Sequence, residues 1–266
     1  MPFHTEREEN MKFRPCIDIH NGKVKQIVGG SLKDEGDHAQ TNFLSSYNAA
    51  YYAGRYKKDG LKGGHIILLN AKTSDYYEAT KAQALKALKE YPQGMQIGGG
   101  ITAENANEYI EAGASHVIVT SYVFQKGEIC WEHLEKLEQA VGKEHIVLDL
   151  SCRKKDQDYY IVTDRWQKFT NIILNKEVLD ELSSHCDEFL VHGVDVEGKV
   201  SGVEENLVKI LSEWGKIPIT YAGGIGSMED LDSFEDLCGG NLDFTIGSAL
   251  DLFGGCISYE DICHRK

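Results

Sequence analysis

The 266-residue chain lacks a long hydrophobic run, an excess of basic residues and the close cysteine pairs typical of zinc sites. No apolar stretch approaches the about 20 residues that span a bilayer, so we expect no membrane insertion. The 42 acidic and 28 basic residues give a net charge of −14, which disfavours non-specific nucleic-acid binding. The seven cysteines are scattered, so we expect free thiols and no metal site.

The first ten residues are polar and acidic, unlike a signal or transit peptide. They predict a flexible lead-in at 1–10 and a cytoplasmic protein. A length of 266 residues fits one large domain over 1–266.

The chain repeats one arrangement in each half: an apolar run that ends in glycines, and a second run about twenty residues later that ends in small residues. In the second half these are Thr220 to Gly226 and Phe244 to Ala249. In the first half they are Gln96 to Ile101 and Val117 to Ser121. Glycines before a helix let backbone amides approach an anion, and matched pairs are far less expected by chance than one turn. We predict contacts to a phosphorylated ligand from Gly99, Gly100, Thr120, Ser121, Gly223, Gly224, Gly247 and Ser248 of these turns, and from Gly202 in the glycine-rich loop over 193–202.

Apolar runs alternate with helical patterns along the chain, which predicts an α/β fold with a parallel sheet. The expected strands cover 13–19, 65–69, 95–98, 116–120, 145–150, 188–192, 217–221 and 244–246. A helix is expected over 43–58, and a long polar loop over 151–171 whose residues 159–162 could pair with a neighbour. An open doubly wound sheet is the rival architecture. The half-chain repeat favours a (β/α)8 barrel of two half-barrels, about 11–141 and 142–266.

In such a barrel the strands' carboxyl ends form the active site. Asp18 ends the first strand and Asp149 ends the fifth, opposite strand, so an acid and a base can act between two phosphate sites. Each aspartate could instead be an ordinary loop or capping residue. His192 also ends a strand and is either structural or functional. Trp166 is either a packing anchor or a lid aromatic that stacks on a planar ligand.

At these positions the chain resembles a known family. Pro15 to Lys23, Ile97 to Ile101, Ala222 to Ile225 and Gly247-Ser248 are similar to the ProFAR isomerases of histidine biosynthesis in their eukaryotic form. The resemblance extends from Met11 to about Phe253. It implies a (β/α)8 barrel, an Amadori rearrangement of an aminoaldose to an aminoketose, a small-molecule substrate with a phosphate at each end, and no cofactor. We expect a monomer.

The resemblance implies that Asp18 is the general base, that Asp149 is the general acid with a raised pKa, and that Trp166 stacks on an imidazole carboxamide. The chain also departs from the family. His192 replaces a threonine usual in bacterial members, so it either assumes that supporting role or leaves it vacant. Thr102 stands where an arginine is frequent, so one phosphate contact differs.

Two alternatives remain. The sister cyclase, which receives ammonia from a glutaminase partner, shares the barrel and the glycine turns. A non-catalytic barrel that senses phosphorylated metabolites would need the turns but not both aspartates.

Overall fold

The computed structural model describes residues 11–27, 31–32, 37–196 and 202–265, so the lead-in predicted at 1–10 lies outside the described residues. Eight parallel strands form a curled sheet in the order β15-β14-β13-β9-β6-β5-β4-β1. Their bounds are β1 Cys16–His20, β4 Gly64–Leu68, β5 Met95–Gly98, β6 Val117–Val119, β9 Ile146–Asp149, β13 Glu188–His192, β14 Ile219–Ala222 and β15 Asp243–Thr245.

The sheet closes through the residues just before β1. Phe13 bridges Phe244 of β15 in parallel, the Arg14 amide donates to the Phe244 carbonyl at 2.8 Å, and the Phe244 amide donates to Lys12 at 3.0 Å. The (β/α)8 barrel predicted from the sequence is therefore confirmed, and the rival open sheet is wrong.

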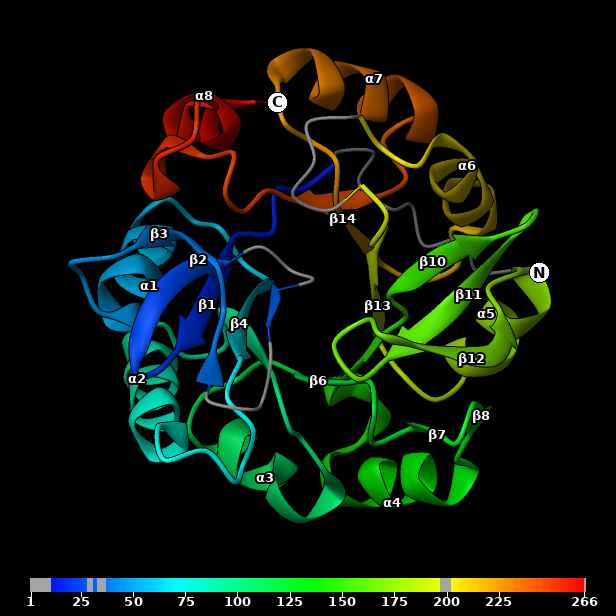
Figure 1. The fold of residues 1–266 in the computed structure, drawn as a ribbon, viewed down its shortest axis with the longest axis horizontal. Helices are drawn as coiled ribbons and strands as arrows, with labels where there is room; N and C mark the ends of the chain where they lie inside the picture. Colours follow the sequence, from blue (N-terminus) through cyan, green and yellow to red (C-terminus); the bar gives the residue numbers. More distant parts are fainter. Residues whose placement is uncertain (1–10, 28–30, 33–36, 197–201, 266) are drawn as a thin grey trace, which may run out of the picture.

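Helices surround the strands (Figure 1). They are α1 Ala49–Lys58, α2 Tyr77–Glu90, α3 Ala103–Glu111, α4 Trp131–Val141, α5 Lys176–Ser183, α6 Glu205–Trp214, α7 Met228–Cys238 and α8 Tyr259–His264, with short 3-10 turns at Lys143–His145 and Asp251–Phe253. Because both faces of the sheet are covered, most side chains of its strands are buried, and the side chains that face the helices are mainly apolar. No helix among these residues is both long and apolar enough to cross a membrane.

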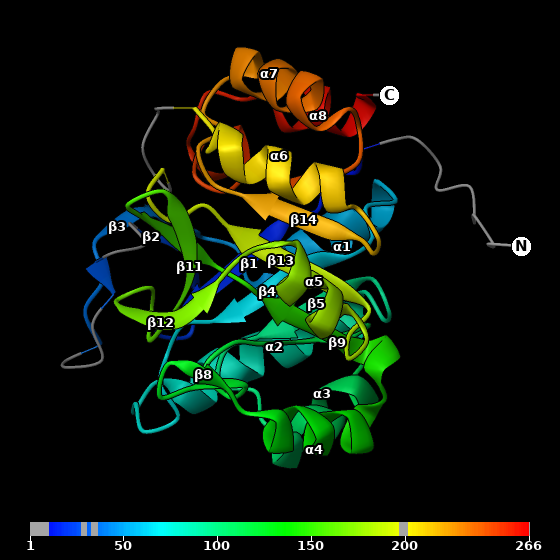
Figure 2. The ribbon, with the colours of Figure 1, turned by 90° about the vertical axis from the view of Figure 1, so that its right-hand side faces the viewer.

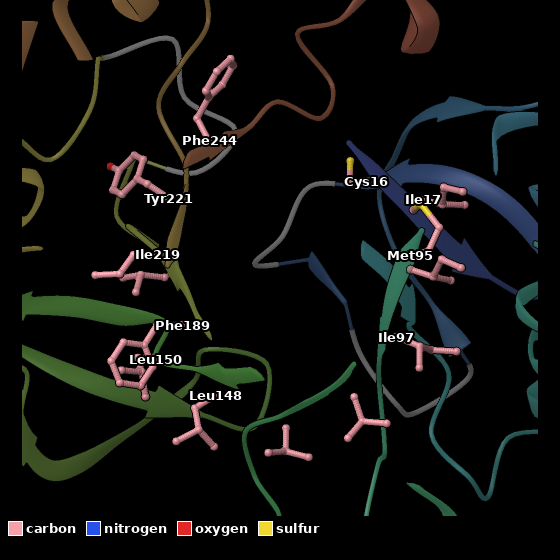
Figure 3. Close-up of a cluster of buried hydrophobic side chains, with 14 of the residues drawn as sticks. Cys16, Ile17, Met95, Ile97, Leu148, Leu150, Phe189, Ile219, Tyr221 and Phe244 are labelled. Atoms are coloured by element: carbon pink, nitrogen blue, oxygen red, sulfur yellow. The ribbon is translucent and has the colours of Figure 1, made fainter. Parts of the chain in front are cut away.

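Alternate side chains of each strand fill the space between sheet and helices. On β14, Ile219 and Tyr221 project to the same side, as Figure 3 shows. The Tyr221 ring stacks on Phe234 of α7 with centroids 5.3 Å apart. The residues between them face the barrel interior, as expected from the two-residue period of a strand. Every second strand residue is therefore available to the barrel lumen.

A polar cluster occupies the lumen near the strands' amino ends. The Arg14 guanidinium donates to Asp243 at 2.8 Å and lies 3.9 Å from Glu188. Gln96 and Thr220 donate to the two Glu188 oxygens at 3.0 and 2.8 Å. Burial raises the pKa of Glu188 and outweighs the opposing charge of Arg14. This cluster fills one end of the barrel with satisfied polar groups and leaves the other end for a site.

Two parts of the chain differ from the sequence prediction. The expected helix over 43–58 begins only at Ala49, because Asn48 caps it by accepting a hydrogen bond from the Tyr51 amide. Residues before it form an antiparallel extension of β1, namely β2 Lys23–Ile27 and β3 Thr41–Leu44. The end of the expected helix was correct.

The expected loop over 151–171 is largely a second sheet, of strands β10 Cys152–Lys155, β11 Asp158–Thr163 and β12 Lys168–Ile173. Tyr159 and Ile161 are buried while Asp158 and Tyr160 are more exposed, as in a strand with one covered face, and Val162 is buried where the strand approaches the cavity. Strands β2–β3 and β10–β12 lie on opposite sides of the barrel mouth (Figure 1) and at the same end of it (Figure 2). A further short hairpin joins β7 Phe124–Gln125 to β8 Glu128–Ile129.

Candidate active site

All eight barrel strands contribute residues to a cavity of about 620 Å³ at their carboxyl ends. Every predicted site residue but one lines it, namely Asp18, Gly99, Gly100, Thr120, Ser121, Asp149, Trp166, His192, Gly223, Gly224, Gly247 and Ser248. Gly202 is the exception. It lies behind the second glycine turn, where its carbonyl oxygen would be 2.1 Å from a Cβ built on Gly224.

The strand order places two pairs of opposed features around this cavity: the two aspartates, and the two sets of glycine turns. Strands β1 and β9, which end at the two aspartates, are four strands apart in either direction around the barrel and so face each other. The glycine turns and their partners follow β5 and β6 on one side and β14 and β15 on the other, and these pairs also face each other. A ligand that reaches from one pair to the other must therefore pass between Asp18 and Asp149.

Asp149 is held by several donors. Its Oδ2 accepts from the Thr120 hydroxyl at 3.0 Å, and its Oδ1 accepts from the Ser151 amide at 2.9 Å and from the Ser151 hydroxyl. The His192 Nδ1 lies 3.9 Å from Oδ1 and 3.1 Å from the Ser151 hydroxyl. His192 thus belongs to the surroundings of Asp149, and the structure brings the two predicted residues together.

The pKa of Asp149 differs from the sequence expectation. Burial acts to raise it, but the nearby His192 and the donors of Ser151 outweigh burial, so the pKa is lowered. The expected raised pKa of this carboxyl is therefore wrong, because Ser151 and His192 stabilise the carboxylate. Asp149 and His192 thus lie close enough for the charge of each to influence the other.

Asp18 has different neighbours. Its Oδ2 accepts a hydrogen bond from the Gln26 side-chain amide at 3.1 Å. Gln26 comes from β2, which folds back on β1 with Ile19 opposite Val24. The two aspartates thus lie in unlike surroundings, one beside an amide and the other beside an imidazole, as an acid and a base require.

The two glycine turns have the same geometry. Gly99 and Gly100 have φ of 102° and 69°, and Gly223 and Gly224 have φ of 115° and 80°. A Cβ on Gly99 would lie 2.1 Å from the Leu68 carbonyl oxygen, so another residue is excluded by the backbone as well as by φ. Both turns lead into helix N-termini, which attract anions.

Two side chains at the start of α7 hydrogen-bond backbone amides near the second glycine turn. Ser227 caps α7 by accepting from the Asp230 amide at 3.1 Å. The Asp230 carboxylate in turn accepts from the Gly226 amide at 3.0 Å. That amide is therefore engaged within the protein, and an anion at this turn would use the preceding amides.

The sequence did not single out several cavity residues. Lys72 follows β4, and its Cε would lie 3.6 Å from a Cβ on Gly100. Arg165 donates to the Leu69 carbonyl at 3.3 Å. Both cations lie on the side of the first glycine turn, which leads through Thr102 into α3. His65 and Gln26 also line the cavity. In the sequence, Arg165 was marked only by its position next to Trp166, and the other three residues only by lying near the end of a strand.

Trp166 lies in the turn between β11 and β12. Asp164, Arg165 and Trp166 all have positive φ, of 49°, 57° and 67°, a conformation unfavourable for these side chains. The Trp166 ring centroid is 5.4 Å from that of His192, at an interplanar angle of 44°. The indole is half-buried beside the cavity, and this position is compatible with a lid.

Comparison with known proteins identifies the family. The family model described as histidine biosynthesis protein matches residues 12–255. The chain belongs to this family. An imidazole-4-carboxamide isomerase of Medicago truncatula, named as chloroplastic and with two 5-phosphoribosyl groups in its full name, is 55% identical over 257 residues, 95% of this chain and 81% of that protein.

Fungal isomerases of the same name are also similar. The protein of Neurospora crassa is 45% identical over 92% of this chain and 93% of its own length. The protein of Saccharomyces cerevisiae is 44% identical over 95% of this chain and 97% of its own length. The likeness thus covers the whole barrel and both glycine turns.

Two expectations concern cysteines and metals. All seven cysteines are free, which confirms the prediction of free thiols. Within the described ranges, no three or more histidine, cysteine, aspartate or glutamate side chains are grouped to hold a metal ion.

Proposed function

We propose that this chain is the histidine-biosynthesis isomerase that converts ProFAR, an aminoaldose with a phosphate at each end, to the corresponding aminoketose. The observation that carries the proposal is that the line joining the two aspartates crosses the line joining the opposed glycine turns in one cavity. Opposed glycine turns suit a ligand with two terminal phosphates, and Asp18 and Asp149 face each other across its middle. The similar plant and fungal isomerases support the same substrate.

The reaction begins at the ribose ring oxygen. The Asp149–His192 pair donates a proton to this oxygen, the bond from oxygen to C1′ breaks, and the nitrogen lone pair forms a protonated Schiff base. Thr120 and Ser151 donate hydrogen bonds to both oxygens of Asp149. The carboxyl group is therefore fixed in orientation for the proton transfer. His192 supplies the proton that a carboxyl with a lowered pKa retains poorly.

The second half of the reaction belongs to Asp18. Its carboxylate removes the proton from C2′, and the electron pair of that bond forms the enolamine while the Schiff base is neutralised. Tautomerisation of the enolamine gives the ketose. Trp166 stacks on the imidazole carboxamide at the mouth of the cavity. The reaction requires no metal or organic cofactor, and we propose that the enzyme acts as a cytoplasmic monomer.

An isomerisation assay tests this function. Purified chain is given ProFAR without ammonia or a glutaminase, and the aminoketose is measured. Turnover under these conditions is expected of the isomerase. Binding without turnover would instead support a sensor, and product formed only on addition of ammonia would support the cyclase.

A further inference from the structure

Gln26 lies at the seam between β1 and β15, where β15 is bonded to residues 12–14, below β1, and not to β1 itself. Above these bonds the Gln26 side chain, 5% exposed, lies between β1 and the turn after β15. A Cβ built on Gly247 would be 2.6 Å from its Oε1. Gln26 thus occupies a fixed space at this seam.

The Gln26 amide nitrogen contacts the base directly. It donates to the Asp18 Oδ2 at 3.1 Å and lies 3.8 Å from the Cys16 sulfur. The Cys16 thiol in turn lies 3.9 Å from the Ile246 carbonyl oxygen, so both sides of the seam are connected. A hydrogen bond from a buried amide restricts the rotation of a carboxylate and favours its charged form.

We propose that Gln26 is the positioning residue of Asp18, which it holds ionised and oriented for removal of the substrate proton. This inference rests on the proposed isomerase function. Gln26 acts through Asp18. Its loss therefore affects proton transfer more than substrate binding, which we assign to the glycine turns.

Gly247 has a matching role at the seam. Its φ is not in the left-handed region, so its backbone would accept alanine. The obstacle to a side chain is the Gln26 Oε1, with the Cys16 sulfur 3.8 Å away. A glycine at 247 therefore leaves room for the amide that holds Asp18, in addition to its place in the second phosphate turn.

The first test replaces the amide by an apolar group of similar length. For Gln26→Leu we expect kcat to fall by about tenfold to a hundredfold, the range for a hydrogen bond to a charged group. We expect KM to change by less than about threefold and the acidic limb of the kcat–pH profile to move to higher pH. The control is Gln96→Leu, because Gln96 is also buried and donates to a carboxylate, Glu188, at the other end of the lumen. It should lower the melting temperature and leave the pH profile unchanged.

A readout without substrate separates this inference from the proposed function. In carbon-13 spectra the midpoint of the Asp18 carboxyl titration should rise in Gln26→Leu, because the carboxylate loses a donor. It should stay unchanged in Gln96→Leu. This shift is expected even if ProFAR is not the substrate. An unchanged midpoint, or a higher KM with normal kcat, would overturn the positioning role.

A double-mutant cycle tests the seam itself. Gly247→Ala should reduce kcat in the wild type, because the new methyl group displaces the Gln26 amide. In a Gln26→Ala background the methyl group has space, so the same change should have a much smaller effect on kcat. Equal effects in both backgrounds would show that Gly247 acts independently of Gln26, against the proposal.

Discussion

Asp18 and Asp149 face each other across the cavity with different partners, so each should be needed for a different proton transfer. Asp18→Asn and Asp149→Asn keep size and shape but remove that transfer. We expect kcat to fall at least about a hundredfold for either change, with KM within a few fold because the phosphate turns are intact. The double variant should be hardly worse than the poorer single one, since both groups serve one reaction sequence.

Steady-state kinetics on ProFAR measure these effects. Asp187→Asn is a suitable control, because this exposed carboxylate precedes β13 at the opposite end of the barrel and lies 3.2 Å from His116. It should leave kcat and KM unchanged. Normal turnover by both active-site variants would show that other residues carry out the proton transfers, and His192 would be the first candidate.

Gly224 offers a second prediction at the scale of one residue. Its φ is 80° and a Cβ there would meet the Gly202 carbonyl oxygen at 2.1 Å, so Gly224→Asp must displace the turn and also place a carboxylate near a phosphate. We expect a large rise in KM. Gly239→Ala is the matched control, because Gly239 also has positive φ but has no atom within 4 Å of its Cβ position.

The Gly239 variant should cost about 1 kcal/mol of stability, as for alanine in the left-handed region, and leave KM unchanged. Equal KM values for wild type and Gly224→Asp would exclude the second turn from the substrate site. Equal rises in both variants would attribute the effect to general strain.

At the scale of elements, the β11–β12 turn carries Trp166 over His192. If the indole stacks on the substrate's base, Trp166→Ala should weaken binding by about 1–3 kcal/mol. Trp166 is only half-buried, so the melting temperature should change little. Substrate binding by calorimetry and thermal unfolding distinguish the two interpretations. A large drop in melting temperature with normal affinity would identify a packing anchor.

The elements also show what the sequence could predict. Runs such as 95–98 and 188–192 matched strands to the residue, because buried parallel strands are short, apolar and bounded by glycine or polar residues. Strands β10–β12 were less visible, since three of the four β10 residues are charged and β12 has exposed residues along one face. Asp18 and Asp149 could be predicted because they end strands. Gln26 and Lys72 could not, because their places depend on how β2 and the loop after β4 fold back.

At the scale of the whole molecule, the negative net charge of the protein opposes the binding of an anionic substrate. A net charge of −14 repels a substrate with two phosphates, so the binding free energy has to come from local groups. In the proposed function, backbone amides and helix N-termini supply these groups at both turns, and Lys72 and Arg165 add positive charge on one side of the cavity. The substrate can therefore be held although the protein as a whole is acidic.

Whole-molecule stability should depend on pH through His65. This β4 side chain is 4% exposed, and burial lowers its pKa to about 3, with the charge of His192 acting in the same direction and that of Asp149 against it. In the unfolded chain the imidazole titrates near 6.5. The unfolded state therefore binds one more proton than the folded state between these values. The stabilisation is complete above about pH 6.5 and is lost as the pH falls.

Urea unfolding at pH 7.5 to 5 measures this linkage. Between pH 6 and 5 the wild type should lose about 1.2 kcal/mol more than His65→Gln. Glu188, whose raised pKa has the opposite effect, is present in both proteins and cancels from the difference. The control His38→Gln removes an exposed histidine and should keep the wild-type slope. Parallel curves for wild type and His65→Gln would mean that His65 takes up its proton in the folded protein, and the barrel interior would then hold a charge beside Asp149.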